Sequence, residues 1–353
     1  MRILHVITSL RTGGAEHLMV DLLPRLRDVG NEVELLLFDG IKTSFYDQLQ
    51  QKGITIHSLG EGGNVYRLRN IFKLMRFIGK YDIIHTHNTA CQLFVPLAKI
   101  LYNSSAKLVT TEHNSTNRRR GKWYLKLVDQ WMYSRYAHII CIAEQTYSNL
   151  VDYIGQKSNI SIVYNGVDTS RFLNPIKDVV PDGNIIVTMI AAFREQKDQD
   201  TLVKAIKVLP SNYRLRLVGD GPRRRVIEDL VDRLKVSSRV DFLGIRTDVP
   251  KLLQESDINV LSSHWEGLSL SSIEGMASGR PFIASDVDGL REIVKDNGIL
   301  FPHGDYKALA SAIRELCENP QYYHDVAERC QAKAKQYDIS VMANKYNELY
   351  KSL

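Results

Sequence analysis

Two glutamates in the last third of the chain are notable because no other charge lies between them. Glu266 and Glu274 are separated by the seven uncharged residues "GLSLSSI". The stretch follows the apolar run "INVLSS" and continues into "GMASGRP", which predicts a buried strand, a loop that carries Glu266, and a helix that begins near Ser271 with Glu274 in its first turn. Ionised carboxylates are the strongest side-chain acceptors for hydroxyl donors, such as those of sugars and riboses.

Cations and peptide amides that could hold an anion are predicted near the same site. The segment "AAFREQKDQD" follows an apolar run and carries Arg194 and Lys197 where that predicted strand ends. Backbone N–H groups around Leu270 to Ser272, at the start of the predicted helix, are expected to be uncapped and to point into the same space. Cations and amides suit a diphosphate, although on charge alone a solvated loop would be the better explanation. Taken together, the hydroxyl acceptors and the anion site predict a binding site for a nucleotide-sugar.

A glycine pair lies between the first predicted strand and the first predicted helix. Gly13 and Gly14 stand in "VITSLRTGGAEHLMVDLL", where glycines let the backbone approach a ligand and a helix start favours an anion. A tight turn explains the pair equally well. The spacing is not G-x-G-x-x-G, and no acidic residue closes a clear second strand, so a nicotinamide cofactor is disfavoured.

Three histidines and one D-x-D pattern raise the question of a metal. His85 and His87 end one apolar run, and His113 ends another. An H-x-H pair can bind a metal, but hydrogen-bonded structural histidines are the favoured interpretation. His113 is better placed as a polar group that faces the space between two domains. The "DVDG" segment at 286–289 directly follows a predicted strand, which favours a turn over a metal site.

Apolar runs alternate with helical patterns along the whole chain, which is typical of parallel sheets covered by helices on both faces. One series extends from "RILHVIT" to "ISIVYNG", and a second begins at "IIVTMIAAF". A linker with Pro, Gly and Asp near residues 165–184 separates them, which predicts an α/β protein with two doubly wound domains. Ligands of such sheets bind beyond the carboxyl ends of the strands, where every motif above falls.

Composition agrees with a soluble globular protein. The 353 residues are 44% apolar and 24% charged, with a net charge of +6. The N-terminal "MRILHVITSL" is too short for a signal peptide or a membrane span, and no other span is predicted. The cysteines form no C-x-x-C pair and predict reduced, mostly buried thiols of a cytosolic protein; they are Cys91, Cys141, Cys317 and Cys330.

Positive charge concentrates between residues 60 and 126, which hold 12 Lys or Arg and 3 Asp or Glu. Basic side chains among aromatic ones suit an anionic membrane surface. A solvated basic face of a helix explains the pattern equally well, and nothing else in the chain supports nucleic-acid binding. The basic residues concerned are Arg67, Arg69, Lys73, Arg76, Lys80, Arg118, Arg119, Arg120, Lys122 and Lys126.

Motifs across nearly the whole chain resemble those of one enzyme family. They are "TGGAE", "IIHTHN", "TEHN", "IVYNGVD", "FREQKD", "LVGDGP", "FLG", "EGLSLSSIEGMASGRPFIASDVDGLREIV" and "YNELY", and the long glutamate segment is highly specific. The chain is similar to glycosyltransferase family 4, or group 1, of the GT-B fold. The resemblance implies two Rossmann-like domains with a deep cleft between them. Residues 1–170 would form the acceptor-side domain, joined by a final helix at about 338–353, and residues 171–337 the nucleotide-sugar domain.

The resemblance also implies roles for individual residues. Glu266 would bind the hydroxyls of the donor sugar and Glu274 those of the ribose, while Arg194 and Lys197 would hold the diphosphate. His113 would touch the donor sugar or the acceptor. Further donor contacts would come from the segment Gly267, Leu268, Ser269, Leu270 and Ser271, from Gly13 and Gly14 next to the phosphates, and from Leu243 and Gly244 next to the nucleobase.

By the same resemblance, the expected activity is retaining transfer of a hexosyl or N-acetylhexosaminyl group from a nucleotide-sugar, without a metal or cofactor. A UDP-sugar is favoured over a GDP-sugar, and the expected acceptor is a lipid-linked saccharide in surface polysaccharide or glycan biosynthesis. The protein would then be cytoplasmic and peripheral on the inner face of the cytoplasmic membrane. Two other functions stay open: a nucleotide-sugar epimerase on the same fold, and a non-catalytic GT-B partner subunit.

Overall fold

The protein folds into two compact units. The structure, a computed structural model, describes residues 1–353 except 12, 114–122 and 178–182. Unit 1 comprises Met1–Gly166 together with Ile339–Leu353, and unit 2 comprises Val167–Asp338. The first unit therefore ends at Gly166, four residues before the predicted boundary, and the last 15 residues of the chain belong to it again.

Unit 1 is built on a parallel sheet whose seven described strands lie in the order β3-β2-β1-β4-β5-β6-β7. Its central strands are continuous apolar runs because both faces of the sheet are covered. In β1, Ile3 and Ile7 belong to one core cluster and Leu4 and Val6 to the other, since successive side chains of a strand point to opposite faces. The strands are β1 (Arg2–Ile7), β2 (Glu32–Leu37), β3 (Thr55–Ser58), β4 (Ile83–Thr86), β5 (Lys107–Glu112), β6 (His138–Cys141) and β7 (Ile160–Ile162).

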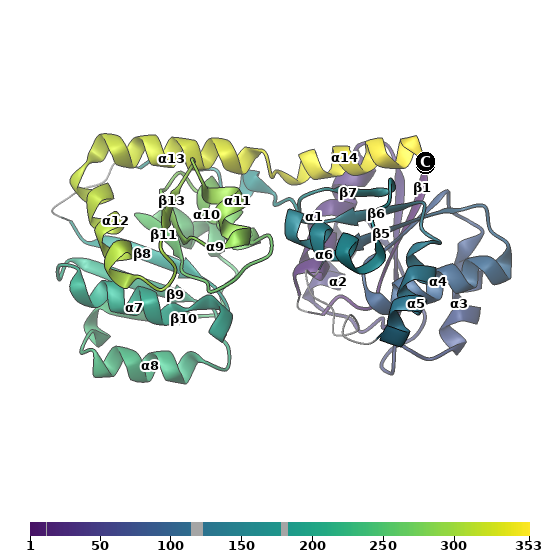
Figure 1. The fold of residues 1–353 in the computed structure, drawn as a ribbon, viewed down its shortest axis with the longest axis horizontal. Coiled ribbons are helices and arrows are strands. Elements are labelled where there is room, and N and C mark those ends of the chain that lie inside the picture. Colours follow the sequence, from purple (N-terminus) through teal and green to yellow (C-terminus); the bar gives the residue numbers. More distant parts are fainter. Residues whose placement is uncertain (12, 114–122, 178–182) are drawn as a thin grey trace. The chain divides into compact units, whose positions relative to one another are not determined.

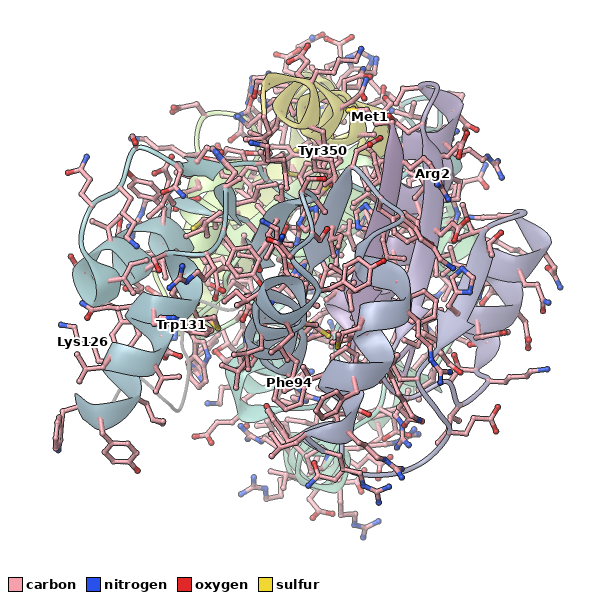
Figure 2. All side chains as sticks on the ribbon, turned by 90° about the vertical axis from the view of Figure 1, so that its right-hand side faces the viewer. Met1, Arg2, Phe94, Lys126, Trp131 and Tyr350 are labelled. Atoms are coloured by element: carbon pink, nitrogen blue, oxygen red, sulfur yellow. The ribbon has the colours of Figure 1, made fainter. Side chains whose placement is uncertain are left out.

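Helices cover both faces of this sheet (Figure 1). α1 and the C-terminal helix α14 supply the core on one face, where Tyr346 and Tyr350 are buried. Figure 2 shows Tyr350 close to Met1, at the start of β1. α3, α4 and α6 supply the core on the other face. The helices of unit 1 are α1 (Gly14–Asp28), α2 (Ser44–Gln51), α3 (Arg69–Ile78), α4 (Thr89–Tyr102), α5 (Trp123–Tyr133), α6 (Glu144–Ile154) and α14 (Ile339–Ser352).

Unit 2 repeats this design with a parallel sheet whose six described strands lie in the order β10-β9-β8-β11-β12-β13. The strands are β8 (Ile185–Ile190), β9 (Tyr213–Val218), β10 (Val240–Gly244), β11 (Ile258–Leu261), β12 (Phe282–Ser285) and β13 (Ile299–Phe301). The helices are α7 (Gln199–Val208), α8 (Arg224–Arg233), α9 (Val249–Glu255), α10 (Leu270–Ala277), α11 (Asp288–Val294), α12 (Tyr306–Glu318) and α13 (Pro320–Lys335).

The "SGRP" segment between α10 and β12 has a structural task. The Arg280 side chain is buried, and its guanidinium donates to the backbone carbonyls of Pro175, Gln254, Ser256, Ser278 and Gly279. Gly279 has a φ of +72°, and a Cβ there would lie 2.6 Å from a backbone carbonyl oxygen. The arginine and the glycine of this segment are therefore required by the packing of the fold.

Each sheet reverses its strand order at one place: between β1 and β4 in unit 1, and between β8 and β11 in unit 2. Ligands of doubly wound sheets bind beyond the carboxyl ends of the strands at this reversal. Gly13 follows β1, Lys197 follows β8 and Glu266 follows β11. The fold thus places the predicted residues of each unit at the position where such sheets bind ligands.

Two expectations from composition can be compared with the structure. Cys91, Cys141, Cys317 and Cys330 are all free and buried, as predicted. In the described part of the chain, no helix has both the length and the apolar character needed to cross a membrane.

Candidate active site

Glu266 lies in the loop after β11, as predicted, and its carboxylate is almost completely enclosed. The side chain is only 6% exposed. It accepts hydrogen bonds from Lys197 Nζ at 2.5 Å, from Ser263 Oγ at 2.6 Å and from Gln196 Nε2 at 3.4 Å. These contacts hold the carboxylate in one orientation at the carboxyl end of the central strand.

Lys197 ends a short 3-10 turn, Glu195–Lys197, that follows β8. Its side chain is 17% exposed and forms the ion pair with Glu266. The sequence places both residues in one site but assigns them to different parts of the donor, the diphosphate and the sugar. In the structure they contact each other, which lets two largely buried charges compensate. An anion that binds Lys197 would therefore lie directly beside the Glu266 carboxylate.

Arg194 comes from the same connection but is exposed. It immediately precedes the 3-10 turn, and its backbone carbonyl accepts from the Lys197 N–H at 3.0 Å. Within the described ranges, its guanidinium makes no hydrogen bond or ion pair. A solvated guanidinium next to a buried lysine is able to reach a ligand without breaking a structural contact.

The start of α10 differs in two details from the predicted helix. α10 begins at Leu270, so the half-buried Glu274 lies in its second turn and not in its first. The Ser272 N–H donates to the Ser269 carbonyl at 3.2 Å, so this amide has a partner in the fold. Ser269 stands at the N-cap without a side-chain capping bond, and its Oγ lies 3.1 Å from Ser271 Oγ. Of the predicted anion-binding amides, those of Leu270 and Ser271 fit best, because the Ser269 hydroxyl does not cap them.

The "DVDG" segment is only partly a turn. Asp288 and Gly289 form the first residues of α11, which corrects the prediction of a turn over 286–289. Both aspartates pair with Arg291, at 2.5 Å for Asp286 and 3.1 Å for Asp288. A Cβ on Gly289 would lie 2.0 Å from the Gly267 carbonyl oxygen and 2.5 Å from that of Glu266. The glycine therefore lets α11 support the Glu266 loop by close backbone contact.

The predicted nucleobase residues end β10, the edge strand of the unit 2 sheet. Leu243 and Gly244 are half-buried. The register of β10 against β9 shifts between Phe242 and Gly244, and Gly244 has a φ of +66°. This irregularity interrupts the ladder near the carboxyl end of β10, which in a parallel sheet lies at the same edge as Lys197 and Glu266.

In unit 1, a carboxylate occupies the place where the sequence predicts an anionic ligand. Gly13 is the N-cap of α1 with an extended backbone, and Gly14 is its first residue. The Glu16 side chain folds back over this helix start, so that a Cβ on Gly13 would lie 2.1 Å from Glu16 Oε2. Burial raises the pKa of the Glu16 carboxyl. A phosphate could therefore approach Gly13 only after this side chain moves, whereas a Cβ on Gly14 would meet no described heavy atom within 4 Å.

Unit 1 also contains a pocket of about 630 Å³ at the carboxyl end of its sheet. It is lined by the segments that follow β1, β2, β3 and β4, by the end of β5 with His113, and by the first turn of α4. Among the lining residues are Arg11, Asp39, Tyr66, Asn88, Glu112 and His113. Glu112 accepts from Gln92 Nε2 at 2.5 Å and from the Tyr133 hydroxyl at 2.8 Å, and Arg11 pairs with Asp39 at 3.1 Å. Many polar groups thus converge on a space that is large enough for a sugar.

Two of the predicted histidines belong to a hydrogen-bonded chain that lines this pocket at His113 and His87 and continues to His5. His113 Nε2 lies 3.0 Å from His87 Nδ1, and His87 Nε2 lies 2.8 Å from His5 Nδ1. His85 contacts the Tyr350 hydroxyl at 2.5 Å and the Thr111 hydroxyl at 2.7 Å. The structural interpretation of His85 and His87 is therefore supported by a partner for each ring nitrogen. Burial lowers the pKa of His113 to about 4 and that of His5 to about 3, so these imidazoles are neutral near pH 7.

Several residues of both sites were not predicted from the sequence. Ser263 and Gln196 hold Glu266, Gly289 supports its loop, and Glu112 and Arg11 line the unit 1 pocket. Ser263 and Gln196 each lie within three residues of a predicted residue, so proximity to the motif was an available signal. For Glu112 the signal was its place at the carboxyl end of a predicted strand, and for Arg11 its place shortly after one.

Comparison with known proteins places the chain in a family. Residues 12–171 match the family described as Glycosyltransferase Family 4, and residues 171–336 match Glycosyl transferases group 1. The lipopolysaccharide core biosynthesis glycosyltransferase LpsD of Rhizobium meliloti is 28% identical, over 91% of this chain and 89% of that protein. The UDP-Gal:alpha-D-GlcNAc-diphosphoundecaprenol alpha-1,3-galactosyltransferase of Escherichia coli is 25% identical, over 80% of this chain and 78% of that protein.

Solved structures resemble this fold over its whole length. The crystal structure of HepE from Anabaena in complex with UDP matches with a TM-score of 0.88 and 23% identity, over 100% of both chains. The apo lipopolysaccharide outer core galactosyltransferase WaaB matches with a TM-score of 0.77 and 16% identity, again over 100% of both chains.

The two parallel-sheet units and these matches define a GT-B protein, as predicted. Because the two matched families together span nearly the whole chain, the protein belongs to glycosyltransferase family 4, group 1, and is a glycosyltransferase enzyme.

Proposed function

We propose that this glycosyltransferase moves a hexosyl or N-acetylhexosaminyl group from a UDP-sugar to a hydroxyl group of a lipid-linked saccharide, with retention at the anomeric carbon. The observation that carries the proposal is the Lys197–Glu266 pair at the strand-order reversal of unit 2. Crystal structures of HepE contain UDP and UDP-glucose, and the E. coli relative is named for a diphosphoundecaprenol-linked acceptor. Both support a UDP-sugar and a lipid-linked acceptor for this chain.

The chemical step requires stabilisation of the negative charge on the leaving group. When the bond from the anomeric carbon to the diphosphate oxygen breaks, both electrons go to that oxygen and negative charge develops there. This charge would be stabilised by the side chains of Lys197 and Arg194 and by the amides of Leu270 and Ser271. Stabilisation of a developing charge is usually the largest contribution to catalysis. The cations of the protein supply this stabilisation, so the proposed reaction uses no metal or cofactor.

The acceptor then completes the reaction from the same face. Its hydroxyl oxygen bonds to the oxocarbenium-like anomeric carbon on the side that the diphosphate has left, and the hydroxyl proton passes to the leaving phosphate. No protein nucleophile is required. Glu266 would orient the donor sugar by accepting its hydroxyl donors, because Lys197 and Ser263 already fix the carboxylate in place. Detection of a glycosyl adduct on Glu266 would contradict this role.

The polar pocket of unit 1 is the proposed place for the acceptor saccharide. Asp39, Asn88 and Glu112 offer acceptors for sugar hydroxyls, and Arg11 offers a donor. His113 lines the same pocket and is neutral, so it is suited to a hydrogen bond with a sugar hydroxyl of the donor or the acceptor.

The test of the function has a binding part and a product part. Calorimetry of the purified full chain with UDP, GDP, UDP-hexoses, UDP-N-acetylhexosamines and GDP-mannose is expected to show tightest binding for the uridine compounds. With a diphosphopolyprenyl-linked saccharide, proton NMR of the first product is expected to show the anomeric configuration of the donor. An inverted product contradicts retention, and conversion of the UDP-sugar into another UDP-sugar without acceptor identifies an epimerase instead.

We also propose that unit 1 docks on an anionic membrane surface on the cytoplasmic side, where a lipid-linked acceptor is embedded. Exposed apolar side chains lie among the predicted basic residues: Leu68 is 69% exposed, Phe72 67% and Trp123 80%. Arg67, Arg69, Arg76 and Lys80 are exposed as well, whereas Lys73 donates inward to the Leu59 carbonyl. Arg118, Arg119, Arg120 and Lys122 lie outside the described residues.

Flotation with liposomes tests this docking surface. Binding is expected with vesicles that contain anionic lipid and not with neutral vesicles, and the double variant Leu68→Ser/Phe72→Ser is expected to weaken it. Val226→Ser in unit 2 is the matched control, because Val226 is 46% exposed and far from these residues in sequence. Equal flotation of the wild type with both lipid compositions would exclude docking through the basic surface.

A further inference from the structure

A second cluster of potential ligands lies in unit 2, beside the Lys197–Glu266 pair in sequence and in space. Asp198 follows the 3-10 turn after β8, His264 follows β11 and His303 follows β13. One ligand atom from each residue lies within 4.8 Å of the other two. The transfer proposed above uses none of these three side chains.

The two imidazoles and the carboxylate face one another. His264 Nδ1 lies 2.5 Å from His303 Nε2 and 3.7 Å from Asp198 Oδ2. In a tetrahedral zinc site with bonds of about 2.0 to 2.1 Å, neighbouring donor atoms are about 3.3 Å apart. These two separations lie on both sides of this value, and the His303 and Asp198 ligand atoms lie within 4.8 Å of each other, so side-chain rotations are needed to bring the three atoms around one ion.

The carboxylate is held in place by the backbone. Asp198 is buried and has a φ of +46°, a left-handed conformation that aspartate tolerates better than most residues. It caps α7 by accepting from the Thr201 N–H at 3.2 Å and from the Thr201 hydroxyl at 2.6 Å. Each carboxylate oxygen keeps a second lone pair, so the cap leaves acceptor capacity that faces His264.

The histidines are accessible but not freely mobile. The His264 N–H donates to the Gln196 carbonyl at 2.7 Å, which fixes the start of the Glu266 loop against the 3-10 turn. The His264 side chain is 30% exposed, and His303 is exposed. A cation can therefore reach the cluster from solvent. The cluster of His5, His85 and His87 in unit 1 lacks this access, because all three are buried.

We propose that Asp198, His264 and His303 bind one divalent ion of the zinc class, with the remaining coordination position open to water. Two imidazoles and one carboxylate suit Zn²⁺, whereas Mg²⁺ prefers oxygen ligands in an octahedral arrangement. The ion would connect the loops after β8, β11 and β13, and so hold the Glu266 loop next to the segment that carries Lys197. It takes no part in bond making or breaking, and its binding is independent of the donor and the acceptor.

Calorimetric titration of the chelator-treated full chain with Zn²⁺ alone tests the site. The expected result is one ion per chain, with no saturable binding of Mg²⁺, and a Zn²⁺-dependent rise in melting temperature, because a ligand that binds only the folded state stabilises it. Substitution with Co²⁺ is expected to give visible absorption bands of a four- or five-coordinate ion.

Three variants and one control decide the assignment. His303→Ala, His264→Ala and Asp198→Asn are each expected to weaken Zn²⁺ binding at least tenfold; asparagine keeps the cap of α7 while it removes the charge. His324→Ala is the control, because His324 is another accessible histidine of unit 2 with a carboxylate at 3.8 Å. Unchanged one-to-one binding in His303→Ala, whose side chain is exposed, would overturn the proposal. Absence of saturable Zn²⁺ binding by the wild type would overturn it as well.

Discussion

The carboxyl edges of the two sheets carry different chemistry, although the sheets are built alike. At the edge of unit 1, buried imidazoles such as His87 and His113 are hydrogen-bonded to one another, and burial lowers their pKa so that they are neutral near pH 7. At the corresponding edge of unit 2, Lys197 and Glu266 form an ion pair. The same strand-order reversal therefore presents neutral imidazoles beside the Arg11–Asp39 pair in unit 1 and the Lys197–Glu266 pair in unit 2.

This difference shows that the sheet topology determines where a site lies, whereas the side chains of the loops determine which chemistry it can perform. Neutral imidazoles and polar side chains around a pocket suit hydroxyl-rich ligands, for which a net charge is unnecessary. A lysine and an arginine that follow a central strand suit a ligand whose charge grows during the reaction. The proposed division of acceptor and donor between the units follows from this contrast.

The largest expected effect is a loss of stability on substitution of Arg280, a buried charged residue of unit 2 outside the proposed active site. Arg280→Met removes a guanidinium that donates to five backbone carbonyls and leaves those acceptors without it. The free energy of unfolding is expected to fall by about 3 kcal/mol or more. Urea unfolding measures this, with Arg225→Met as the control because the Arg225 side chain is 83% exposed. Equal loss in both variants would mean that these carbonyls are satisfied without Arg280.

The next largest effect is expected on catalysis, from substitution of Lys197 at the carboxyl edge of the unit 2 sheet. Lys197→Ala is expected to lower kcat by about 10²-fold, as loss of one donor to a developing oxyanion does in other enzymes. Steady-state kinetics with the donor and acceptor identified above measure it. Lys204→Ala is the matched control, since Lys204 is exposed on the following helix α7. A change in KM without a change in kcat would contradict leaving-group stabilisation.

A third substitution tests whether the position of the Glu266 loop matters. Gly289→Ala would place a Cβ 2.0 Å from the Gly267 carbonyl oxygen, so the loop or α11 must move. Overpacking of this kind costs about 1–3 kcal/mol of stability, and displacement of Glu266 is expected to lower kcat/KM about tenfold or more. Lys204→Ala is the control for activity, because Lys204 is exposed on α7 and has no assigned role in the site. Full activity of Gly289→Ala would show that the loop accommodates this shift.

The smallest effect concerns the neutral imidazoles of unit 1 and the dependence of stability on pH. Burial lowers the pKa of His113 to about 4, below the value of about 6.5 for an unfolded chain. The unfolded chain then binds more protons below pH 6.5, so the stability from neutral His113 is complete above pH 6.5 and declines as pH falls towards 4. Denaturant unfolding at pH 7 and pH 5 is expected to show a smaller decline for His113→Asn than for the wild type. The exposed His324 provides the control, as His324→Asn, and an identical decline for wild type and His113→Asn would contradict the assignment.

Much of the fold followed from local patterns. Continuous apolar runs predicted the central strands, and their alternation with helical segments predicted two parallel sheets, because a parallel strand must be covered on both faces. The first unit ends at Gly166, four residues before the predicted boundary. Linker composition indicates a region in which a boundary lies and does not identify the exact residue. The start of α10 was one residue earlier than predicted, which moved Glu274 to the second turn, because helix ends depend on local hydrogen bonds that periodicity does not specify.

The sequence by itself determined the fold class, the family resemblance and the residues around which the unit 2 site is built. Only the tertiary structure decided which side chains contact each other: that Lys197 pairs with Glu266, that Glu16 covers Gly13, and that Gly289 supports the Glu266 loop. The physical reason is that hydrophobic periodicity is local and sets the strands and helices one at a time. Pairing of charges, burial of histidines and close backbone contacts arise between segments distant in sequence, and they are defined only when the sheets bring those segments together.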